Sequence, residues 1–183
     1  MKNQIAPEII GQAYEDLKEL VKKYAASDQP VLFVGETGTG KELFAKIYMA
    51  ESKRTGKKMT TNCAAESDAL LRSEIFGHVK GAFTGADKVR KGKISECDEG
   101  ILFLDEIGDA SPSFQAAILR VSEGNSFTPL GSDKEITGVN TLIIAATCRP
   151  QNIRDDLKMR FQVLPVPPLQ TYDIPALAKH FLK

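Results

Sequence analysis

The 183-residue sequence has no net charge, few cysteines and no long apolar run, and each absence excludes a class of protein. Lys and Arg together number 24, as do Asp and Glu, which argues against a nucleic-acid binder driven by overall charge. Cys63, Cys97 and Cys148 lie far apart and form no CxxC pair, so neither a disulfide framework nor a zinc site is indicated. Because no segment reads as a membrane span or signal region, we expect a cytoplasmic protein without membrane partners.

What the sequence does contain is an alternation of short apolar runs and longer amphipathic stretches. Strands are expected at residues 30–35, 57–63, 100–109, 140–147 and 161–169. Helices are expected at residues 14–26, 41–52, 67–77, 111–124 and 173–183, with Ser67, Ser111 and Asp173 as N-caps. A long loop is expected at about 77–93, and a hairpin over 126–138 that turns near Gly131. Strands that are apolar throughout predict a parallel sheet covered by helices on both faces, within one domain.

The stretch VLFVGETGTGKE has the pattern Gly-x-x-x-x-Gly-Lys, from Gly35 to Lys41. It follows an expected strand and opens an expected helix, which is the setting of a phosphate-binding loop. There, backbone N–H groups and the helix N-terminus hold phosphate oxygens, while the lysine adds a positive charge. The alternative is a glycine-rich turn with a chance lysine. The predicted phosphate-binding residues are Gly35, Glu36, Thr37, Gly38, Thr39, Gly40, Lys41 and Glu42.

The stretch ILFLDEIGD places Asp105 and Glu106 at the carboxyl end of a buried strand, where open α/β sheets bind their ligands. Two adjacent acids at this position suit a division of labour. Asp105 would orient Mg²⁺ and its waters, and Glu106 would polarise an attacking water. The alternative is that both acids are solvated or cap the next helix, a role that we expect of Asp109.

Three motifs, GETGTGKE, GAFTGA and LFLDE, follow one another in this order. Together they resemble the AAA+ domain of the sigma-54-dependent transcription activators (the bacterial enhancer-binding proteins), over nearly the whole chain. The phosphate loop is generic, whereas GAFTGA between the two Walker motifs is specific. Glu42, which stands where many NTPases have Ser or Thr, agrees with this family. The resemblance implies an α/β fold, a three-layer αβα P-loop NTPase of AAA+ type, with a parallel five-stranded sheet of order 5-1-4-3-2.

The resemblance also gives the GAFTGA segment a role. It implies that Gly81, Ala82, Phe83, Thr84, Gly85 and Ala86 form the tip of a loop that contacts sigma-54, with Phe83 and Thr84 making the contact. An exposed Phe on glycine hinges would make a movable contact tip. The alternative is a Phe83 packed into the domain's own core.

Further site residues follow from the resemblance alone. Asn62 matches the switch asparagine that holds the catalytic Glu106, and Thr147 falls at the sensor I position. Arg154 and Arg160 match the paired arginines that reach a neighbouring subunit's site, with Arg160 as the finger; the alternative is two solvated surface arginines. Ile10 and Gly11 match the segment that lines the adenine pocket. In the family, Asn usually follows the sensor threonine, whereas Cys148 follows it here.

The function implied is an ATPase, with ATP and Mg²⁺, that assembles as a hexameric ring and remodels the sigma-54 RNA polymerase closed complex. Residues 1–183 would be the α/β core subdomain, without the lid, receiver and helix-turn-helix domains, and with no direct DNA binding of its own. Two alternatives stay open. One is a lid-less, catalytically impaired module that binds nucleotide and sigma-54. The other is a chaperone-type AAA+ protein, which GAFTGA disfavours.

Overall fold

A computed structural model describes residues 12–65, 67–124 and 126–168 of the chain. Five strands form the main sheet: β1 (Val31–Val34), β2 (Lys58–Asn62), β5 (Ile101–Asp105), β8 (Leu142–Thr147) and β9 (Gln162–Pro165). Their order is β2-β5-β8-β1-β9, and all neighbours are parallel. Counted along the chain, this is the predicted order 5-1-4-3-2, which is confirmed.

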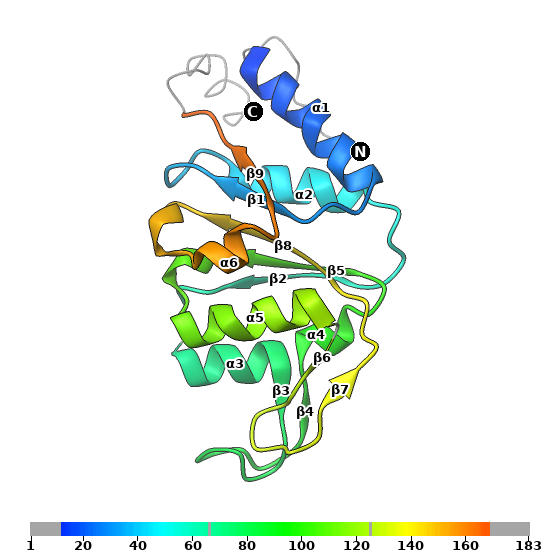
Figure 1. The fold of residues 1–183 in the computed structure, drawn as a ribbon, viewed down its shortest axis with the longest axis vertical. Helices are drawn as coiled ribbons and strands as arrows, with labels where there is room; N and C mark the ends of the chain where they lie inside the picture. Colours follow the sequence, from blue (N-terminus) through cyan, green and yellow to red (C-terminus); the bar gives the residue numbers. More distant parts are fainter. Residues whose placement is uncertain (1–11, 66, 125, 169–183) are drawn as a thin grey trace, which may run out of the picture.

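Helices cover both faces of this sheet (Figure 1). One face carries α1 (Gln12–Ala26) and α2 (Lys41–Glu51). The other face carries α3 (Asp68–Phe76), α4 (Lys93–Glu96), α5 (Pro112–Gly124) and α6 (Asp155–Lys158). Short 3-10 helices follow β5 and β8, at η2 (Ile107–Asp109) and η3 (Pro150–Asn152). The predicted three-layer αβα sandwich is therefore confirmed.

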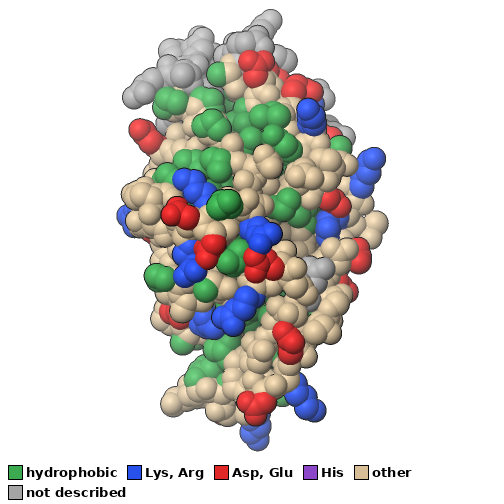
Figure 2. Space-filling model, viewed as in Figure 1, with side chains coloured by type: hydrophobic (Ala, Val, Ile, Leu, Met, Phe, Trp, Pro, Cys, Tyr) green, Lys and Arg blue, Asp and Glu red, His purple; other side chains and the backbone are tan. Residues whose placement is uncertain are grey.

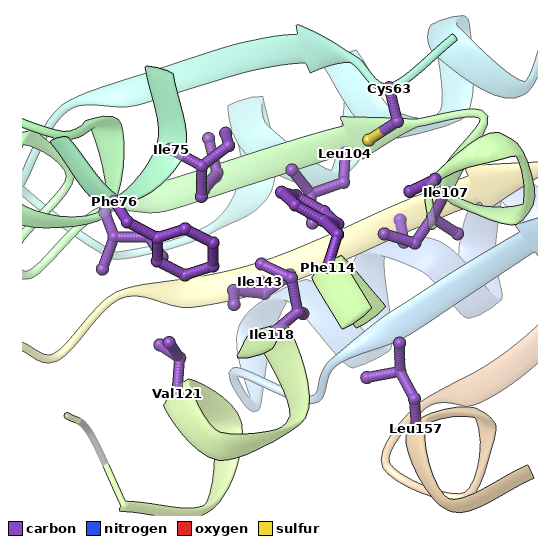
Figure 3. Close-up of a cluster of buried hydrophobic side chains, with 14 of the residues drawn as sticks. Cys63, Ile75, Phe76, Leu104, Ile107, Phe114, Ile118, Val121, Ile143 and Leu157 are labelled. Atoms are coloured by element: carbon purple, nitrogen blue, oxygen red, sulfur yellow. The ribbon is translucent and has the colours of Figure 1, made fainter. Parts of the chain in front are cut away.

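The alternation of side chains along each strand builds two separate cores. In β5, Ile101 and Phe103 pack toward α1 and α2, whereas Leu102 and Leu104 pack toward α3 and α5. Figure 3 shows the second core, where Phe114 from α5 lies among side chains of the sheet and of α3. A strand buried on both faces needs an apolar residue at every position, which explains its continuous apolar sequence.

Helix ends follow the local sequence in part. The Ser111 hydroxyl accepts a hydrogen bond from the Phe114 N–H at 3.1 Å, as a cap of α5. Ser67 occupies the N-cap position of α3, as predicted, but its side chain makes no capping hydrogen bond. Gly77, with φ 79°, ends α3 as expected. The helix predicted at 173–183, with its cap Asp173, lies outside the described residues.

Two small hairpins project from the end of the sandwich that carries α3 and α5 (Figure 1). The predicted long loop at about 77–93 contains an antiparallel pair, β3 (Gly77–His78) and β4 (Arg90–Lys91). The predicted second hairpin is confirmed, with β6 (Ser126–Phe127) paired to β7 (Ile136–Thr137). The two hairpins are joined where the N–H of Val79 donates to the carbonyl of Leu130 at 3.1 Å.

Charges of both signs are mixed over the face in view in Figure 2, where Lys and Arg are interspersed with Asp and Glu, in keeping with the zero net charge. Within the described ranges, no helix has both the length and the apolar character that crossing a bilayer requires.

Candidate functional site

The phosphate loop follows β1 at the carboxyl edge of the sheet and leads into α2. Gly38 and Gly40 have φ values of 84° and 91°, a region that residues with a Cβ rarely adopt. A Cβ placed on either glycine would meet no atom within 4 Å, so the space in front of them is open. Because α2 begins immediately after Gly40, its free N–H groups face this space, as an anion site requires.

Lys41 is the buried cation of the site, with 6% of its surface exposed. Its Nζ donates to the carbonyls of Gly35 and Glu36 at 3.0 and 3.1 Å. It also lies 3.3 Å from Oε1 of Glu106. A buried ammonium with two neutral acceptors and one carboxylate is held in a fixed position. The loop thus has the backbone shape, the open space and the charge that fit a nucleotide's phosphates.

Glu106 follows β5 in a left-handed conformation, with φ 50° and ψ 47°. Its Oε2 accepts a hydrogen bond from the backbone N–H of Cys148 at 2.8 Å, across from the end of β8. Burial raises the pKa of Glu106, but hydrogen bonds from Cys148 and the charge of Lys41 outweigh it, so the net pKa is lowered. Glu106 is therefore an ionised carboxylate at neutral pH, held in a conformation that few non-glycine residues occupy.

Asp105, the last residue of β5, accepts the backbone N–H of Glu106 on Oδ1 at 3.0 Å. Burial and the neighbouring Glu106 charge raise its pKa. In the described part of the chain, no three His, Cys, Asp or Glu side chains cluster as a complete metal cage. A magnesium ion at a phosphate site needs only one or two carboxylates besides phosphates and water, so Asp105 beside the phosphate loop fits one.

The GAFTGA segment is a closed turn at the tip of the β3–β4 stem. The Gly81 N–H donates to the Ala86 carbonyl at 2.9 Å, and the Ala86 N–H to the Phe83 carbonyl at 3.0 Å. Gly85, like Gly81, has a positive φ, and a Cβ on either would meet nothing within 4 Å. The Phe83 ring packs edge-on against His78, with centroids 5.0 Å apart at 72°.

Phe83 therefore takes a position between the two that the sequence left open. It is half-buried on its own stem and absent from both cores, while Thr84 is exposed. The His78 ring that it contacts is buried and is held by the Ser73 hydroxyl of α3 at 2.7 Å. The Phe83 ring is thus linked to α3 through His78 and its hydrogen bond with Ser73.

The model of the family described as "Sigma-54 interaction domain" matches residues 9–167. The chain belongs to this family. It is 47% identical to the Nif-specific regulatory protein of Rhodobacter capsulatus over 174 residues, and 45% identical to the transcriptional regulatory protein ZraR of Escherichia coli over 183 residues. These matches cover 88% and 93% of this chain, but 30% and 41% of the relatives.

Solved structures agree with the family assignment. NtrX from Brucella abortus in complex with ATP superposes with a TM-score of 0.82 at 28% identity, covering all of this chain and 43% of that one. NtrX in complex with ADP gives 0.81 at 30% identity, covering 97% and 42%. The chain thus spans less than half the length of the relatives that it matches.

Two residues of this sigma-54 interaction domain make local contacts other than those implied by their family roles. Asn62 ends β2 opposite Asp105, but its Oδ1 accepts the N–H of Ala64 at 2.9 Å, and Glu106 has Lys41 and Cys148 as partners instead. Thr147 is fully buried at the end of β8, with its hydroxyl accepting the N–H of Arg149 at 2.9 Å. Asn62 and Thr147 thus lie near Asp105 and Glu106, but neither side chain forms a hydrogen bond with Glu106.

The two arginines lie on the surface, each held by an acid of the same chain. Arg154 pairs with Asp156 at 2.5 Å, and Arg160 pairs with Glu123 at the end of α5. Glu42 is exposed and pairs with Lys46 one turn along α2, at 2.9 Å, rather than facing the phosphate loop. Ile10 and Gly11, the predicted adenine-pocket segment, lie outside the described residues.

Sequence reasoning missed Gln115. Although polar, it is 1% exposed within α5. Its Nε2 donates to the carbonyls of Ala110 and Asn152, both at 3.1 Å, and its Oε1 accepts the N–H of Arg154 at 2.9 Å. Gln115 therefore ties the segment after the acids to the segment that carries the arginines. The sequence offers one signal of this burial, which is that Gln115 directly follows Phe114, an apolar residue on the inward side of the predicted helix.

The cysteines divide by environment. Burial raises the pKa of Cys63 to about 12 and that of Cys97 to about 11, so both thiols are protonated at neutral pH. Both are small core residues, as was expected of Cys63. Cys148 alone is half-buried, next to Glu106.

Proposed function

We propose that this chain is an ATP-hydrolysing sigma-54 interaction domain, which uses nucleotide turnover to act on sigma-54 through its GAFTGA loop. The observation that carries the proposal is the contact of Lys41 with Glu106, beside an open phosphate loop, in a chain of the sigma-54 interaction domain family. The chain would supply an α/β core in which nucleotide binds at the carboxyl edge of the sheet and sigma-54 at the hairpin end.

Binding would begin with an exchange of partners at Lys41. The phosphates of ATP would enter the open space before Gly38 and Gly40, where backbone N–H groups and the α2 N-terminus favour anions. A phosphate oxygen would take the place that Glu106 occupies on the Lys41 ammonium. The likeness to NtrX in complex with ATP supports nucleotide as the ligand.

Hydrolysis would follow from the release of Glu106. Once free of Lys41, its ionised carboxylate is a hydrogen-bond acceptor that can orient water toward the terminal phosphate. Asp105 would hold Mg²⁺ through water, and the ion, when bound, neutralises phosphate charge. Asn62, one strand away from Asp105, would receive Glu106 in that state, as the family role implies.

The remaining positive charge would come from a second copy of the chain. Arg154 and Arg160 are exposed, and their ion pairs within the described residues are with surface acids, so both can be released at small cost. In a ring, they would enter the neighbour's phosphate site, where a finger arginine contributes a factor of roughly 10³–10⁵ to the rate. This makes turnover dependent on assembly.

The base of the GAFTGA loop is attached to β2, the strand that pairs with β5. Lys93, just after the loop, donates to the Thr60 carbonyl and the Thr61 hydroxyl of β2, at 2.7 and 2.8 Å, and pairs with Glu74 of α3. Both arms of the loop are thereby attached to the strand that ends at Asn62. A shift of β2 relative to β5 on phosphate release would move the loop base as a unit.

The test is ATP hydrolysis per subunit measured at rising protein concentration. We expect a specific rate that climbs with concentration, because each site needs arginines from a neighbour. Glu106→Gln should keep nucleotide affinity and lose turnover, whereas the exposed Glu51→Gln should behave as wild type. A rate that stays at the Glu106→Gln level at every concentration would instead indicate a binding module, and full turnover by Glu106→Gln would refute the role given to Glu106.

A further inference from the structure

Beside the GAFTGA loop, a groove of about 310 Å³ lies between the β3–β4 stem and the β6–β7 hairpin. We call it the stem groove. Its apolar lining comes from Phe76, Val79, Val89, Pro129 and Ile136. Val89 is 73% exposed, although it is a large apolar residue on a narrow projecting hairpin. Val79, Pro129 and Ile136 are half-buried and Phe76 is buried, so Val89 is the exposed apolar residue of the lining. Exposed apolar surface beside a groove is a feature of protein interaction sites.

The charges that line the stem groove are all positive. Arg90 and Lys91 come from β4 and Lys134 from the opposite hairpin, and all three are exposed. In the part of the chain that the structure describes, none of the three forms an ion pair, and no acid lines the groove. The lining of the groove thus carries positive charge around its apolar residues, while Asp133 and Glu135 flank Lys134 outside it.

We propose that the stem groove is a docking site for an acidic, amphipathic segment of sigma-54, separate from the contact made by the GAFTGA tip. Apolar side chains of that segment would fill the floor, and flanking carboxylates would pair with Arg90, Lys91 and Lys134. A protein segment fits better than a nucleic acid, because phosphates would satisfy the cations and leave the apolar floor uncovered. The inference rests on the proposed function for the identity of the partner.

The groove is also connected to the contact tip. His78 lines the groove, and the Phe83 ring packs on it at 5.0 Å. A segment bound in the groove would therefore contact His78, the residue on which Phe83 packs. Docking there would hold the loop beside sigma-54 while Phe83 leaves its stem and returns to it.

The experiment measures the dissociation constant of purified sigma-54 for the immobilised chain, with a non-hydrolysable ATP analogue, at low and at physiological ionic strength. Val89→Asp places a carboxylate on the floor at a position too exposed to affect folding. The double variant Lys91→Glu/Lys134→Glu, the rim variant, reverses two of the positive charges that line the groove. Lys23→Glu/Lys53→Glu makes the same change of charge on exposed residues that do not line the groove, and serves as the control.

We expect each groove variant to weaken binding about tenfold or more, and the control to match wild type. Wild-type affinity should fall with salt, and that of the rim variant should fall less. Groove variants that bind like wild type would overturn the docking site while leaving the proposed function standing. No binding by wild type would overturn both. Groove variants that lose affinity only for a short DNA duplex would show a nucleic-acid site, and would refute this proposal.

Discussion

The phosphate loop and the GAFTGA loop both contain pairs of glycines with positive φ, Gly38 and Gly40 in the first and Gly81 and Gly85 in the second. Their supports differ. The first lies at the end of a strand that pairs on both sides in a five-stranded sheet, whereas the second lies on a pair of two-residue strands. The same local conformation thus serves two physical purposes.

At the phosphate loop, Lys41 is buried and Glu106 is half-buried, and each is held by several partners. At the hairpin end, cations such as Lys91 form no ion pair within the described residues, and the tip is attached through contacts such as that of Phe83 with His78. Chemistry requires groups fixed before the substrate arrives, whereas a loop that acts on a partner must move. Glycine permits both a fixed and a movable loop, and the element that supports the loop decides which of the two forms.

The largest expected effect is on nucleotide binding, from Lys41→Ala. Removing the buried ammonium deletes its hydrogen bonds to phosphate, and we expect a loss of about 3 kcal/mol, roughly a hundredfold in affinity. Titration with a fluorescent ATP analogue measures it. Lys46→Ala, on the exposed side of the same helix, is the control. Equal affinities in the two variants would mean that the loop is a glycine-rich turn and not a phosphate site.

The next largest effect is on the free energy of unfolding, through the segments that Gln115 ties together beside the acids. Gln115→Ala would leave the carbonyls of Ala110 and Asn152 and the N–H of Arg154 without this partner, at about 1–3 kcal/mol for each buried group left unpaired. Urea unfolding should show the loss, and Gln162→Ala on exposed β9 should not. If both variants unfold at the same urea concentration, Gln115 does not tie these segments together.

A smaller effect distinguishes backbone strain at the hairpin end from loss of a contact with sigma-54. Gly85→Ala and Gly138→Ala both force a Cβ into a positive-φ position with open space around it, so each should cost about 1 kcal/mol of folding free energy. Only Gly85→Ala should also weaken sigma-54 binding, because Gly85 is in the tip that we propose contacts sigma-54. Loss of sigma-54 affinity in both variants would mean that strain at this end, and not the tip, governs binding.

The phosphate loop, the strand order of the sheet and the β3–β4 stem could be predicted from the sequence to different degrees. The phosphate loop and the acids could be predicted from the sequence, because a strand, a glycine pattern and a helix are contiguous there. The strand order depended on the family resemblance, since periodicity alone gave only a parallel, two-sided sheet. The strands β3 and β4 were missed because two residues are too few to show an alternation.

The partners of Glu106 could not be predicted, for a physical reason. The hydrogen bond from Cys148 comes from a backbone N–H, which every residue except proline carries, so residue identity holds no signal of it. Gln115 was missed because polar residues on helices are mostly exposed, and its burial depends on three backbone groups from other segments.

The smallest expected effect on stability comes from breaking the ion pair of Arg160 with Glu123, and it tests whether this pair keeps Arg160 from entering a neighbouring site. Glu123→Gln removes the surface partner of Arg160, and an exposed pair contributes only about 0–1 kcal/mol, so the free energy of unfolding should barely change. Turnover should still respond, because an arginine that has lost its partner within the chain enters the neighbouring site more readily. We expect the curve of specific ATPase rate against protein concentration to move to lower concentration.

The control for this experiment is Glu19→Gln, which breaks an equally exposed pair with Lys22 on α1 and should leave the curve in place. Arg160→Ala should keep nucleotide affinity and lose turnover at every concentration. A Glu123→Gln curve that moves to higher concentration would mean that Glu123 positions Arg160 for the neighbour, which reverses the interpretation of the pair. The direction of the shift therefore decides whether this ion pair restrains assembly or prepares it.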